Sequence, residues 1–284
     1  MTDARLVVAC AQMRSGRDPL ANRDAAVSLV REAASRGARF VQTPEMTSLV
    51  ARGRAELFEK ASAAEADPVL AALRETARTE RIWLQIGSLA VRNGDRFANR
   101  AYLIDDAGEV AATYDKVHLF DADLSGGESW RESATYAGGD AAIAADTPFG
   151  RLGLTICYDV RFPALYRALA EAGAEILTAP ACFTRQTGQA HWHVLQRARA
   201  IETGSFMVSA AQGGLHEDGR ETFGHSMIVD PWGRVLADAG GDAPGVILAE
   251  IDLAAVAEAR QRIPALKNAR PFTVRVADAR PAVA

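Results

Sequence analysis

The sequence predicts a single α/β domain in which two β-sheets lie between outer layers of helices. Two observations predict this fold class. Short apolar runs alternate with segments of helical periodicity in the first half of the 284 residues, and apolar runs cluster in the second half. Because each sheet and helix must bury its apolar side against another layer, this pattern is typical of sheets covered by helices. A chain of this length can also bury a large core.

The predicted elements of the first half begin and end at residues that suit such ends. Gly37 follows the first helix at a position typical of a C-cap, and Asp67-Pro68 suit the cap and first turn of the second. The hairpin turns at Asp106-Ala107-Gly108. In order, the sequence predicts a strand at 5–13, a helix at 22–35, a short strand that ends before Pro44, a helix at 68–81, a strand at 82–89 and a hairpin at 102–114.

The second half begins with a predicted long loop at 121–150, which contains glycine pairs and little hydrophobic periodicity. Long loops in compact domains are usually functional or disordered. After it the sequence predicts strands at 151–157, 175–180, 206–212, 225–230, 233–238 and 245–252, and helices at 162–174, 189–203 and 253–262. We expect one domain over residues 1–273, followed by a C-terminal tail at 274–284.

Composition and charge argue against several classes of partner. The net charge of −4 includes no strong block of one sign, which disfavours nucleic acid. No apolar run approaches the ~20 residues of a membrane-spanning helix. The N-terminus lacks the basic and apolar regions of a signal peptide, and the three cysteines are too scattered for a disulfide framework. We therefore expect a cytoplasmic protein with no nucleic-acid or membrane partner.

Three residues that could carry chemistry each follow a predicted strand: Glu45, Lys116 and Cys157. Ligand sites in α/β proteins gather beyond the carboxyl ends of strands, so these distant residues could meet in one crevice. Each also has a structural interpretation when taken alone. Cys157 could be an inert core residue, Glu45 a cap or loop charge, and Lys116 a surface lysine. Their combination is what indicates a catalytic site.

A carboxylate, an ammonium and a thiol in contact can hydrolyse an acyl bond. The carboxylate accepts the thiol proton as a general base, and the thiolate attacks a carbonyl carbon. The ammonium keeps the carboxylate ionised, favours the thiolate and can bind the oxyanion of a tetrahedral intermediate. The backbone N–H of Tyr158, at the start of the helix after Cys157, would be a second oxyanion donor.

Two rival kinds of site have weaker support in the sequence. Cys157 could pair with a histidine, for which His191, His193, His216 and His225 are available. His191 and His193 lie two apart on a predicted helix, so at most one of them could face the crevice. A zinc site needs three or four convergent ligands, and this segment has no H-x-x-x-H pair. The glycine pairs match no phosphate-binding loop, and we expect no metal.

At these residues the sequence resembles the nitrilase superfamily of carbon–nitrogen hydrolases. The resemblance rests on TPEM around Glu45, YDKVHLFD around Lys116 and LTICYDVRFP around Cys157, in the order of the superfamily's Glu-Lys-Cys pattern. The segment RESATYAGGD is similar to the one that carries the superfamily's second glutamate, which maps to Glu132. The resemblance covers roughly residues 5–273.

Within the superfamily the sequence resembles the Nit branch, through KVHLFD, AGAEIL, RARAIET, GHSMIVDPWG and the His191-Trp192 pair. Two Nit subfamilies are close: the deaminated glutathione amidases, favoured by RARAIE and HSMIVDPWG, and the ω-amidases, which share KVHLFD and act on 2-oxo acid amides such as 2-oxoglutaramate. The resemblance implies a four-layer α-β-β-α sandwich and no metal or organic cofactor. It also implies a homodimer or higher homo-oligomer formed through helices and the C-terminal segment.

The resemblance implies a role for each catalytic residue as well. Glu45 would be general base and then acid, and Cys157 the nucleophile. Lys116 and the Tyr158 N–H would stabilise the oxyanion, while Glu132 would orient Lys116 and the substrate. The expected reaction is hydrolysis of the linear C–N bond of a small carboxylate-bearing amide to an acid and ammonia, through a Cys thioester.

The remote carboxylate of such a substrate needs a cationic partner, for which arginine is suited. The residues predicted to bind substrate are Arg161, Arg185, His191 and Trp192. Arg161 could instead form an ion pair with Asp159, and the histidine-tryptophan pair could simply pack and cap a helix. Alternative functions are a true nitrilase, an N-carbamoyl-amide hydrolase, or a non-enzymatic binding protein on the same scaffold.

Overall fold

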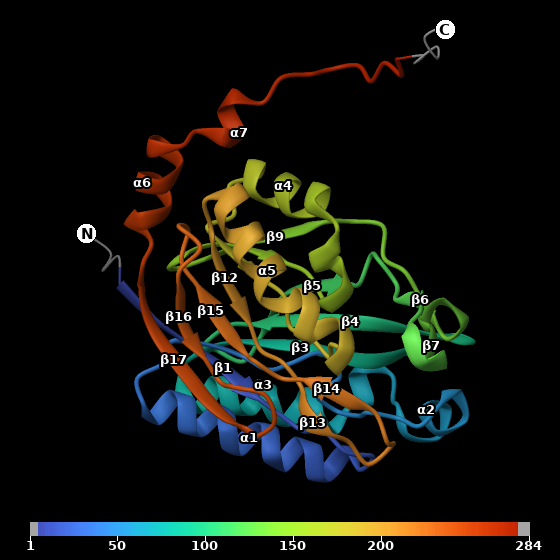
Figure 1. Cartoon of the computed structure of the whole chain (residues 1–284). Helices are drawn as coiled ribbons and strands as arrows, with labels where there is room; N and C mark the ends of the chain where they lie inside the picture. The colour runs from blue at the N-terminus through green and yellow to red at the C-terminus, as the bar shows by residue number, and fades with distance from the viewer. Residues whose placement is uncertain (1–4, 278–284) are drawn as a thin grey trace, which may run out of the picture.

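The computed structural model describes residues 5–277 and forms four layers, as Figure 1 shows. One outer layer contains α1 (Pro19–Ser35) and α3 (Pro68–Glu80), and the other contains α4 (Pro163–Glu171) and α5 (Arg185–Thr203). Two β-sheets lie between these helices. The predicted α-β-β-α sandwich is confirmed.

The first sheet pairs the first and the last strands of the described residues. In spatial order its strands are β17 (Gly245–Asp252), β1 (Arg5–Gln12), β2 (Phe40–Gln42), β3 (Trp83–Asn93), β4 (Arg96–Ile104) and β5 (Val110–Asp115), with β8 (Tyr136–Ala137) beside β4. β17 pairs antiparallel with β1, whereas β1, β2 and β3 are parallel neighbours. β3, β4 and β5 continue as antiparallel pairs, so the predicted hairpin at 102–114 is confirmed.

The second sheet contains the strand that leads to Cys157. In spatial order its strands are β16 (Val235–Asp238), β15 (Met227–Val229), β12 (Phe206–Ser209), β11 (Ile176–Thr178), β10 (Gly150–Leu154) and β9 (Ile143–Thr147). β10, β11 and β12 are parallel, and the outer pairs are antiparallel. A separate hairpin is formed by β13 (Gly213–Leu215) and β14 (Glu221–Phe223).

The larger apolar core lies between the two sheets. Leu6, Val8 and Phe40 of the first sheet belong to one buried cluster with Leu154 and Ile176 of the second. A second core lies between the first sheet and helices α1 and α3. Because the inner strands are covered on both faces, their sequences are continuous apolar runs rather than alternating patterns. This is why they could be predicted as buried strands.

The two sheets approach closely beside the carboxyl end of β2. A Cβ atom on Gly87 of β3 would lie 2.2 Å from the carbonyl oxygen of Thr43 and 2.5 Å from the Cβ of Pro180. Glycine is therefore required at this position. The close approach holds the loop after β2 against the loop after β11, and both loops contribute to the site described below.

Several predicted boundaries are wrong. α1 begins at Pro19 rather than at residue 22, because the Asp18 carboxylate caps it by accepting a hydrogen bond of 2.9 Å from the Leu20 N–H. α5 begins at Arg185 rather than at 189, so this arginine is helical and not in a loop. Short helices that were not predicted include α2 (Arg54–Lys60) and the 3-10 helix η1 (Ala64–Ala66).

The segment 121–150 is not the single long loop that was predicted. It contains β9, which forms an edge of the second sheet, and β8, which extends the first. Its other elements are β6 (Asp121–Asp123), β7 (Ser129–Arg131) and the 3-10 helices η2 (Ser125–Gly127) and η3 (Glu132–Ala134). Most of these elements are two or three residues long, too short to give a periodic hydrophobic signal.

After residue 268 the chain leaves the body of the molecule, as Figure 1 shows. α6 (Ala254–Arg262) and α7 (Ala265–Asn268) are followed by residues without regular structure. Phe272, Val274 and Val276 are 83–87% exposed in this stretch. The predicted tail at 274–284 falls partly outside the described residues, from 278 onward. No helix between residues 5 and 277 combines the length and apolar character needed to cross a membrane.

Candidate active site

Cys157 lies at a tight turn where β10 gives way to the 3-10 helix η4 (Cys157–Arg161). Its φ of +49° is a left-handed conformation, which is costly for a residue other than glycine. The surrounding backbone holds this turn: the Cys157 N–H donates to the Pro180 carbonyl at 2.9 Å, and the Asp159 N–H donates to the Ile156 carbonyl at 3.1 Å. A cysteine in a strained, well-supported turn beside a cavity is typical of a nucleophile.

The buried Asp159 carboxylate ties this turn to the segment around Lys116. Its Oδ2 accepts hydrogen bonds from the Tyr114 hydroxyl at 2.6 Å and the Ile156 N–H at 2.9 Å. Its Oδ1 accepts from the His118 backbone N–H at 3.1 Å and lies 2.7 Å from His118 Nδ1. Tyr114 and His118 stand two residues before and two residues after the lysine. One carboxylate therefore fixes the cysteine turn relative to the lysine.

Glu45, Lys116 and Glu132 form a buried chain of charges. The Lys116 ammonium lies 2.8 Å from Glu45 Oε1 and 2.9 Å from Glu132 Oε2. The three side chains are 2–10% exposed. Removing charges from water is costly, and here the cost is offset because one cation bridges two anions. The structure thus brings together three of the four residues predicted to be catalytic.

Neutral donors fix the orientation of both carboxylates. Asn99 on β4 donates from Nδ2 to Glu45 Oε1 and to Glu132 Oε1, at 2.9 Å in each case. The Cys182 N–H donates to Glu45 Oε2 at 2.8 Å, and the Phe120 N–H donates to Glu132 Oε2 at 2.6 Å. Every oxygen of the two carboxylates therefore accepts at least one hydrogen bond.

Cys157 completes the group through a hydrogen bond between its thiol and Glu45. Burial by itself would raise the pKa of Glu45, but the charge of Lys116 and the hydrogen bonds from Lys116, Cys157 and Asn99 hold that pKa below its ordinary value. Burial and the charge of Glu45 raise the pKa of Cys157 well above its ordinary value, although Lys116 opposes them.

The resting site therefore holds a carboxylate beside a neutral thiol at neutral pH. Burial would lower the pKa of Lys116, but Glu132 and Glu45 raise it well above the ordinary value, so the ammonium persists. Lys116 favours the thiolate, as the sequence analysis expected, yet burial and Glu45 outweigh it. A thiol whose proton is already bonded to an ionised carboxylate is arranged for general-base activation during attack.

The four predicted catalytic residues and Tyr158 line one cavity of about 270 Å³. Tyr158 is the second residue of η4, where an N–H has no partner inside the helix. Trp130 and Arg220 share the wall of this cavity. The cavity therefore combines a reactive end with aromatic and cationic surfaces that could hold the rest of a substrate.

Arg220 is the least exposed arginine of the cavity wall, with 24% of its side chain accessible. Its guanidinium bonds Asp218 Oδ2 at 2.6 Å and lies 5.0 Å from the ring centroid of Trp130. Burial lowers the pKa of Arg220, but the neighbouring Cys182 and Asp218 raise it above the ordinary value. The group stays charged, and it was not predicted from the sequence.

Four residues were predicted to bind substrate: Arg161, Arg185, His191 and Trp192. None of these four residues lines the cavity. Arg161 bonds His191 Nδ1 at 3.1 Å rather than Asp159, which is occupied by the Tyr114 and His118 contacts.

Arg185 and Trp192 also interact with other protein groups. Arg185 forms ion pairs with Glu221 at 3.0 Å and Asp242 at 2.5 Å. Trp192 is fully buried and donates from Nε1 to the His225 carbonyl at 2.8 Å. These residues were predicted because they are close to the site in sequence, but their tertiary contacts direct their side chains elsewhere.

The Cys–His alternative has no geometric support in residues 5–277, because no histidine there lines the cavity. His216 is buried and bonds the Ser15 carbonyl and the Thr222 hydroxyl. His193 and His225 lie beside Asp238, and neither lines the cavity that contains Cys157. The cavity wall therefore offers carboxylate, ammonium and thiol groups.

Three residues that position the site were missed in the sequence: Asn99, Asp159 and Arg220. Asn99 interrupts an otherwise mostly apolar strand, which was the available signal for a buried polar role. Asp159 was considered only as a partner of Arg161. Arg220 lies in a polar turn before β14, where nothing in the local sequence distinguishes it from a surface arginine.

Comparisons with known proteins agree with this geometry. A family model described as carbon-nitrogen hydrolase matches residues 7–261. The deaminated glutathione amidase of Homo sapiens is 41% identical over 271 residues, which cover 93% of this chain and 82% of that protein. The crystal structure of the C. elegans NitFhit protein has a TM-score of 0.87 at 37% identity, covering 95% of this chain and 66% of that longer chain.

A third comparison concerns the cysteine. An amidase from Nesterenkonia sp. AN1 has a TM-score of 0.79 at 26% identity, covering 93% of this chain and 94% of that chain. In a glutamate-to-glutamine mutant of that amidase, the acetamide moiety of fluoroacetamide is covalently attached at the active-site cysteine.

The fold and the comparisons together define a hydrolase of carbon–nitrogen bonds built on an α-β-β-α sandwich. The chain belongs to the carbon-nitrogen hydrolase family, in the Nit branch of the nitrilase superfamily. The resemblance on which the sequence analysis relied is confirmed at the level of family and fold.

Proposed function

We propose that this chain is an amidase that hydrolyses a linear amide through a thioester on Cys157. The observation that carries the proposal is the contact of Glu45 with both Lys116 and Cys157 inside one buried cavity. Glu45 acts as general base and then acid, and Cys157 as nucleophile. Lys116 and the Tyr158 N–H stabilise the oxyanion, while Glu132 orients Lys116.

The first half of the reaction acylates the cysteine. Glu45 removes the thiol proton as Cys157 Sγ bonds to the amide carbon, and the carbonyl electrons move onto the oxygen. The ammonium of Lys116 is already held by two carboxylates, so it meets the oxyanion without reorganisation. Glu45 then passes the proton to the amide nitrogen, the C–N bond breaks, and the amine leaves.

The second half of the reaction hydrolyses the thioester. Glu45, ionised again, removes a proton from a water molecule that attacks the thioester carbon. The C–S bond breaks, Glu45 returns the proton to the sulfur, and the carboxylic acid leaves. One base thus serves both halves, which divides a difficult displacement into two easier steps.

Deaminated glutathione is the substrate we propose, in keeping with the name of the human relative. Its scissile amide joins a 2-oxo dicarboxylic acyl group to the amine of cysteinylglycine, so hydrolysis yields 2-oxoglutarate and the dipeptide. A primary amide such as 2-oxoglutaramate yields 2-oxoglutarate and ammonia. The ammonia expected in the sequence analysis is therefore the product of the ω-amidase alternative, and the leaving group distinguishes the two activities.

Arg220 is the residue we propose for a substrate carboxylate. It is charged, partly buried, and on the wall of the cavity that contains Cys157. Trp130 beside it offers an apolar face to the chain of the substrate. A guanidinium in this setting binds a carboxylate through strong, directed hydrogen bonds.

The test compares kcat/KM for deaminated glutathione, 2-oxoglutaramate, a nitrile and an N-carbamoyl compound, with 2-oxoglutarate and ammonia both measured where they can form. We expect the highest kcat/KM with deaminated glutathione and none in the Cys157→Ala chain. A higher kcat/KM for 2-oxoglutaramate would identify the chain as an ω-amidase instead. If the folded wild-type chain hydrolyses no amide, the binding-protein alternative is favoured.

We propose in addition that the chain forms a homodimer or a higher homo-oligomer in the cytoplasm. The exposed apolar side chains of the C-terminal segment support self-association, because such side chains rarely stay in water without a partner. The three free cysteines Cys10, Cys157 and Cys182 suit a reducing compartment.

A further inference from the structure

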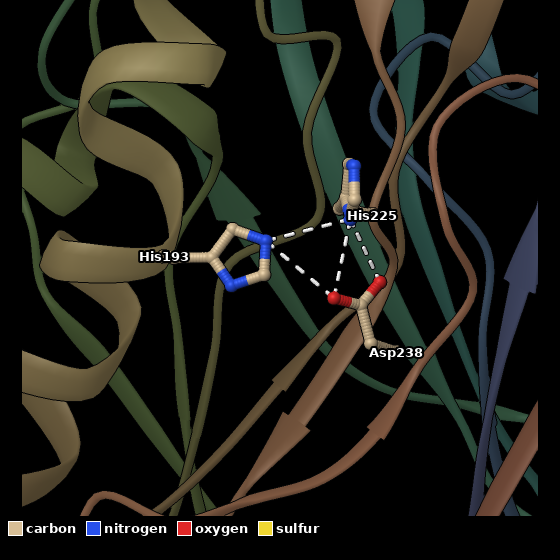
Figure 2. A group of neighbouring side chains, drawn as sticks. All are labelled: His193, His225 and Asp238. Atoms are coloured by element: carbon tan, nitrogen blue, oxygen red, sulfur yellow. Dashed lines mark hydrogen bonds and ion pairs between the residues drawn. The ribbon is translucent and has the colours of Figure 1, made fainter.

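Two histidines and one aspartate from three separate elements converge in one cluster, as Figure 2 shows. His193 lies on α5, His225 lies in the connection between β14 and β15, and Asp238 ends β16. Their side chains are 26–40% exposed, so the cluster is open to solvent on one side. None of the three lines the cavity that contains Cys157.

The three ligand atoms form a nearly equilateral triangle. His193 Nε2 lies 3.4 Å from His225 Nδ1 and 3.5 Å from Asp238 Oδ2, and His225 Nδ1 lies 3.1 Å from the same oxygen. Ligand atoms held about 2.0–2.1 Å from a tetrahedral Zn²⁺ ion stand about 3.3–3.4 Å apart. The spacing therefore matches three corners of a zinc coordination tetrahedron with little movement of the side chains.

We propose that His193, His225 and Asp238 bind one divalent first-row transition-metal ion, of which Zn²⁺ fits the geometry best. The fourth coordination position faces solvent. Two imidazole nitrogens and one carboxylate oxygen suit this class of ion, whereas Mg²⁺ and Ca²⁺ prefer oxygen ligands alone. The cluster is exposed enough for an ion to enter from water.

The backbone around the cluster holds the ligands in place. The Gly240 N–H donates to Asp238 Oδ1 at 2.9 Å, which leaves Oδ2 toward the histidines. The His225 N–H donates to the Gly240 carbonyl at 2.7 Å, and the His225 carbonyl accepts from Trp192 Nε1 at 2.8 Å. His225 adopts φ of +55°, a strained conformation kept by these contacts. Orientation of ligands by outer hydrogen bonds is typical of metal sites.

The site was missed in the sequence because its ligands are separated by more than thirty positions, from 193 to 225, and come from different elements. A histidine pair within one helix could involve only His191 and His193. A bound ion would join α5 to the second sheet and to the end of β14. β14 follows Arg220 directly, so the ion would stabilise the wall that carries the proposed carboxylate ligand.

The experiment titrates the full-length, chelator-treated chain with Zn²⁺ and Co²⁺ by isothermal titration calorimetry, with Mg²⁺ as the negative control. The Cys157→Ala background removes the active-site thiol, which could itself bind zinc. In this background His193→Asn removes one ligand from an exposed helix face, and Asp238→Asn removes another. His191→Asn is the matched control, since this exposed histidine lies on the same helix outside the cluster.

We expect one Zn²⁺ per chain in the Cys157→Ala background, a Co²⁺ absorption spectrum typical of a nitrogen- and oxygen-ligated tetrahedral site, and a rise of Tm on adding Zn²⁺. His193→Asn and Asp238→Asn should each weaken binding by about a hundred-fold or more, while His191→Asn leaves it unchanged. Equal binding by all four chains, or no one-to-one binding in the Cys157→Ala background, would overturn the proposal. This outcome is independent of amidase activity.

Discussion

Glu45 is the residue whose protonation the surrounding groups control most closely. Its two oxygens accept from Lys116 and Asn99 on one side and from the Cys182 N–H on the other. Burial alone would favour the neutral acid, yet these donors keep the carboxylate ionised and its pKa depressed. The base is thus ready at neutral pH, and the raised pKa of Cys157 keeps the proton on sulfur until attack.

The pH dependence of kcat/KM should follow from these directions. Because the Glu45 pKa is depressed below 4.5, activity should be lost only as pH falls below that ordinary value. The pKa values of Cys157 and Lys116 are raised, so kcat/KM should not fall on the alkaline side until the pH exceeds 9.0, the ordinary thiol pKa. The profile is measured with a substrate whose thiol is methylated, and circular dichroism controls for unfolding. An acid limb near pH 6 would contradict this assignment of the base.

Substitution of Arg220 tests the proposed carboxylate contact. Arg220→Ala should lower kcat/KM by about 10- to 100-fold, as expected for one lost charge-assisted hydrogen bond. Arg185→Ala is the matched control, because Arg185 does not itself line the cavity and is held by ion pairs with Glu221 and Asp242. The Arg220→Ala substitution should lower kcat/KM less for an analogue that lacks the carboxylate than for the natural substrate. Equal losses for both arginine variants would speak against a specific role.

At the scale of elements, the site depends on loops held between two sheets. Gly87 lets the Thr43 loop and the Pro180 loop meet, and Asp159 joins the turn after β10 to the end of β5. Glu45 and Cys157 therefore stand on short connections that follow buried strands. Such support is what keeps reacting groups in the geometry that catalysis requires.

Removal of the Tyr114 hydroxyl tests the link through Asp159. Tyr114→Phe should lower the free energy of unfolding by about 1.5–3 kcal/mol, because it removes a buried hydrogen bond to a charged group. It should also lower kcat by loosening Lys116 relative to Cys157. Ser129→Ala removes a comparable hydroxyl-to-carboxylate bond at the surface and should cost less than about 0.5 kcal/mol. Chemical denaturation with both variants measures the contrast, and similar costs would refute it.

At the scale of the whole molecule, the C-terminal segment is the part that the body of the domain does not cover. Phe272, Val274 and Val276 remain exposed, and Ile263 just before α7 is 60% exposed. Trp232, which is 57% exposed, lines the same groove as Ile263. A second copy of the chain is the partner we propose for these side chains. Burial of this apolar surface would stabilise the association.

Sedimentation analysis tests the oligomer. The 30.3 kDa chain should sediment as a dimer or larger species. The combined variant Phe272→Ser, Val274→Ser and Val276→Ser should shift the distribution toward monomer, because it removes apolar surface without touching the sandwich. An exposed substitution on another face, Leu20→Ser, serves as the control. A wild-type monomer, or an unchanged oligomer in the triple variant, would exclude this segment as the contact.

The sequence predicts the sandwich and the central charges for identifiable physical reasons. Strands buried on both faces appear as continuous apolar runs, and Glu45 and Cys157 each follow such a run. Lys116 follows β5, an edge strand that is partly exposed. Glu132 was reached only through the resemblance, because it lies in a segment without periodicity. Its contact with Lys116 depends on η3, an element of three residues with no sequence signal of its own.

The remaining site residues could not be predicted because tertiary contacts decide where their side chains lie. Arg161 and Arg185 are close to the site along the chain, but His191, Glu221 and Asp242 hold them. Arg220, about sixty positions after the cysteine, reaches the cavity only because the connection between β13 and β14 folds back over it. Local pattern carries no information on such long-range pairings.

The most direct test of the account is to locate the acyl group formed during turnover. Samples of the wild-type chain acting on its best amide substrate are quenched in acid, digested and mapped by mass spectrometry, with Cys157→Ala and Cys182→Ala chains in parallel. We predict an acyl thioester on the Cys157 peptide in the wild type and in Cys182→Ala, and neither adduct nor turnover in Cys157→Ala. An acyl group on Cys182, or turnover retained by Cys157→Ala, would contradict the proposed mechanism.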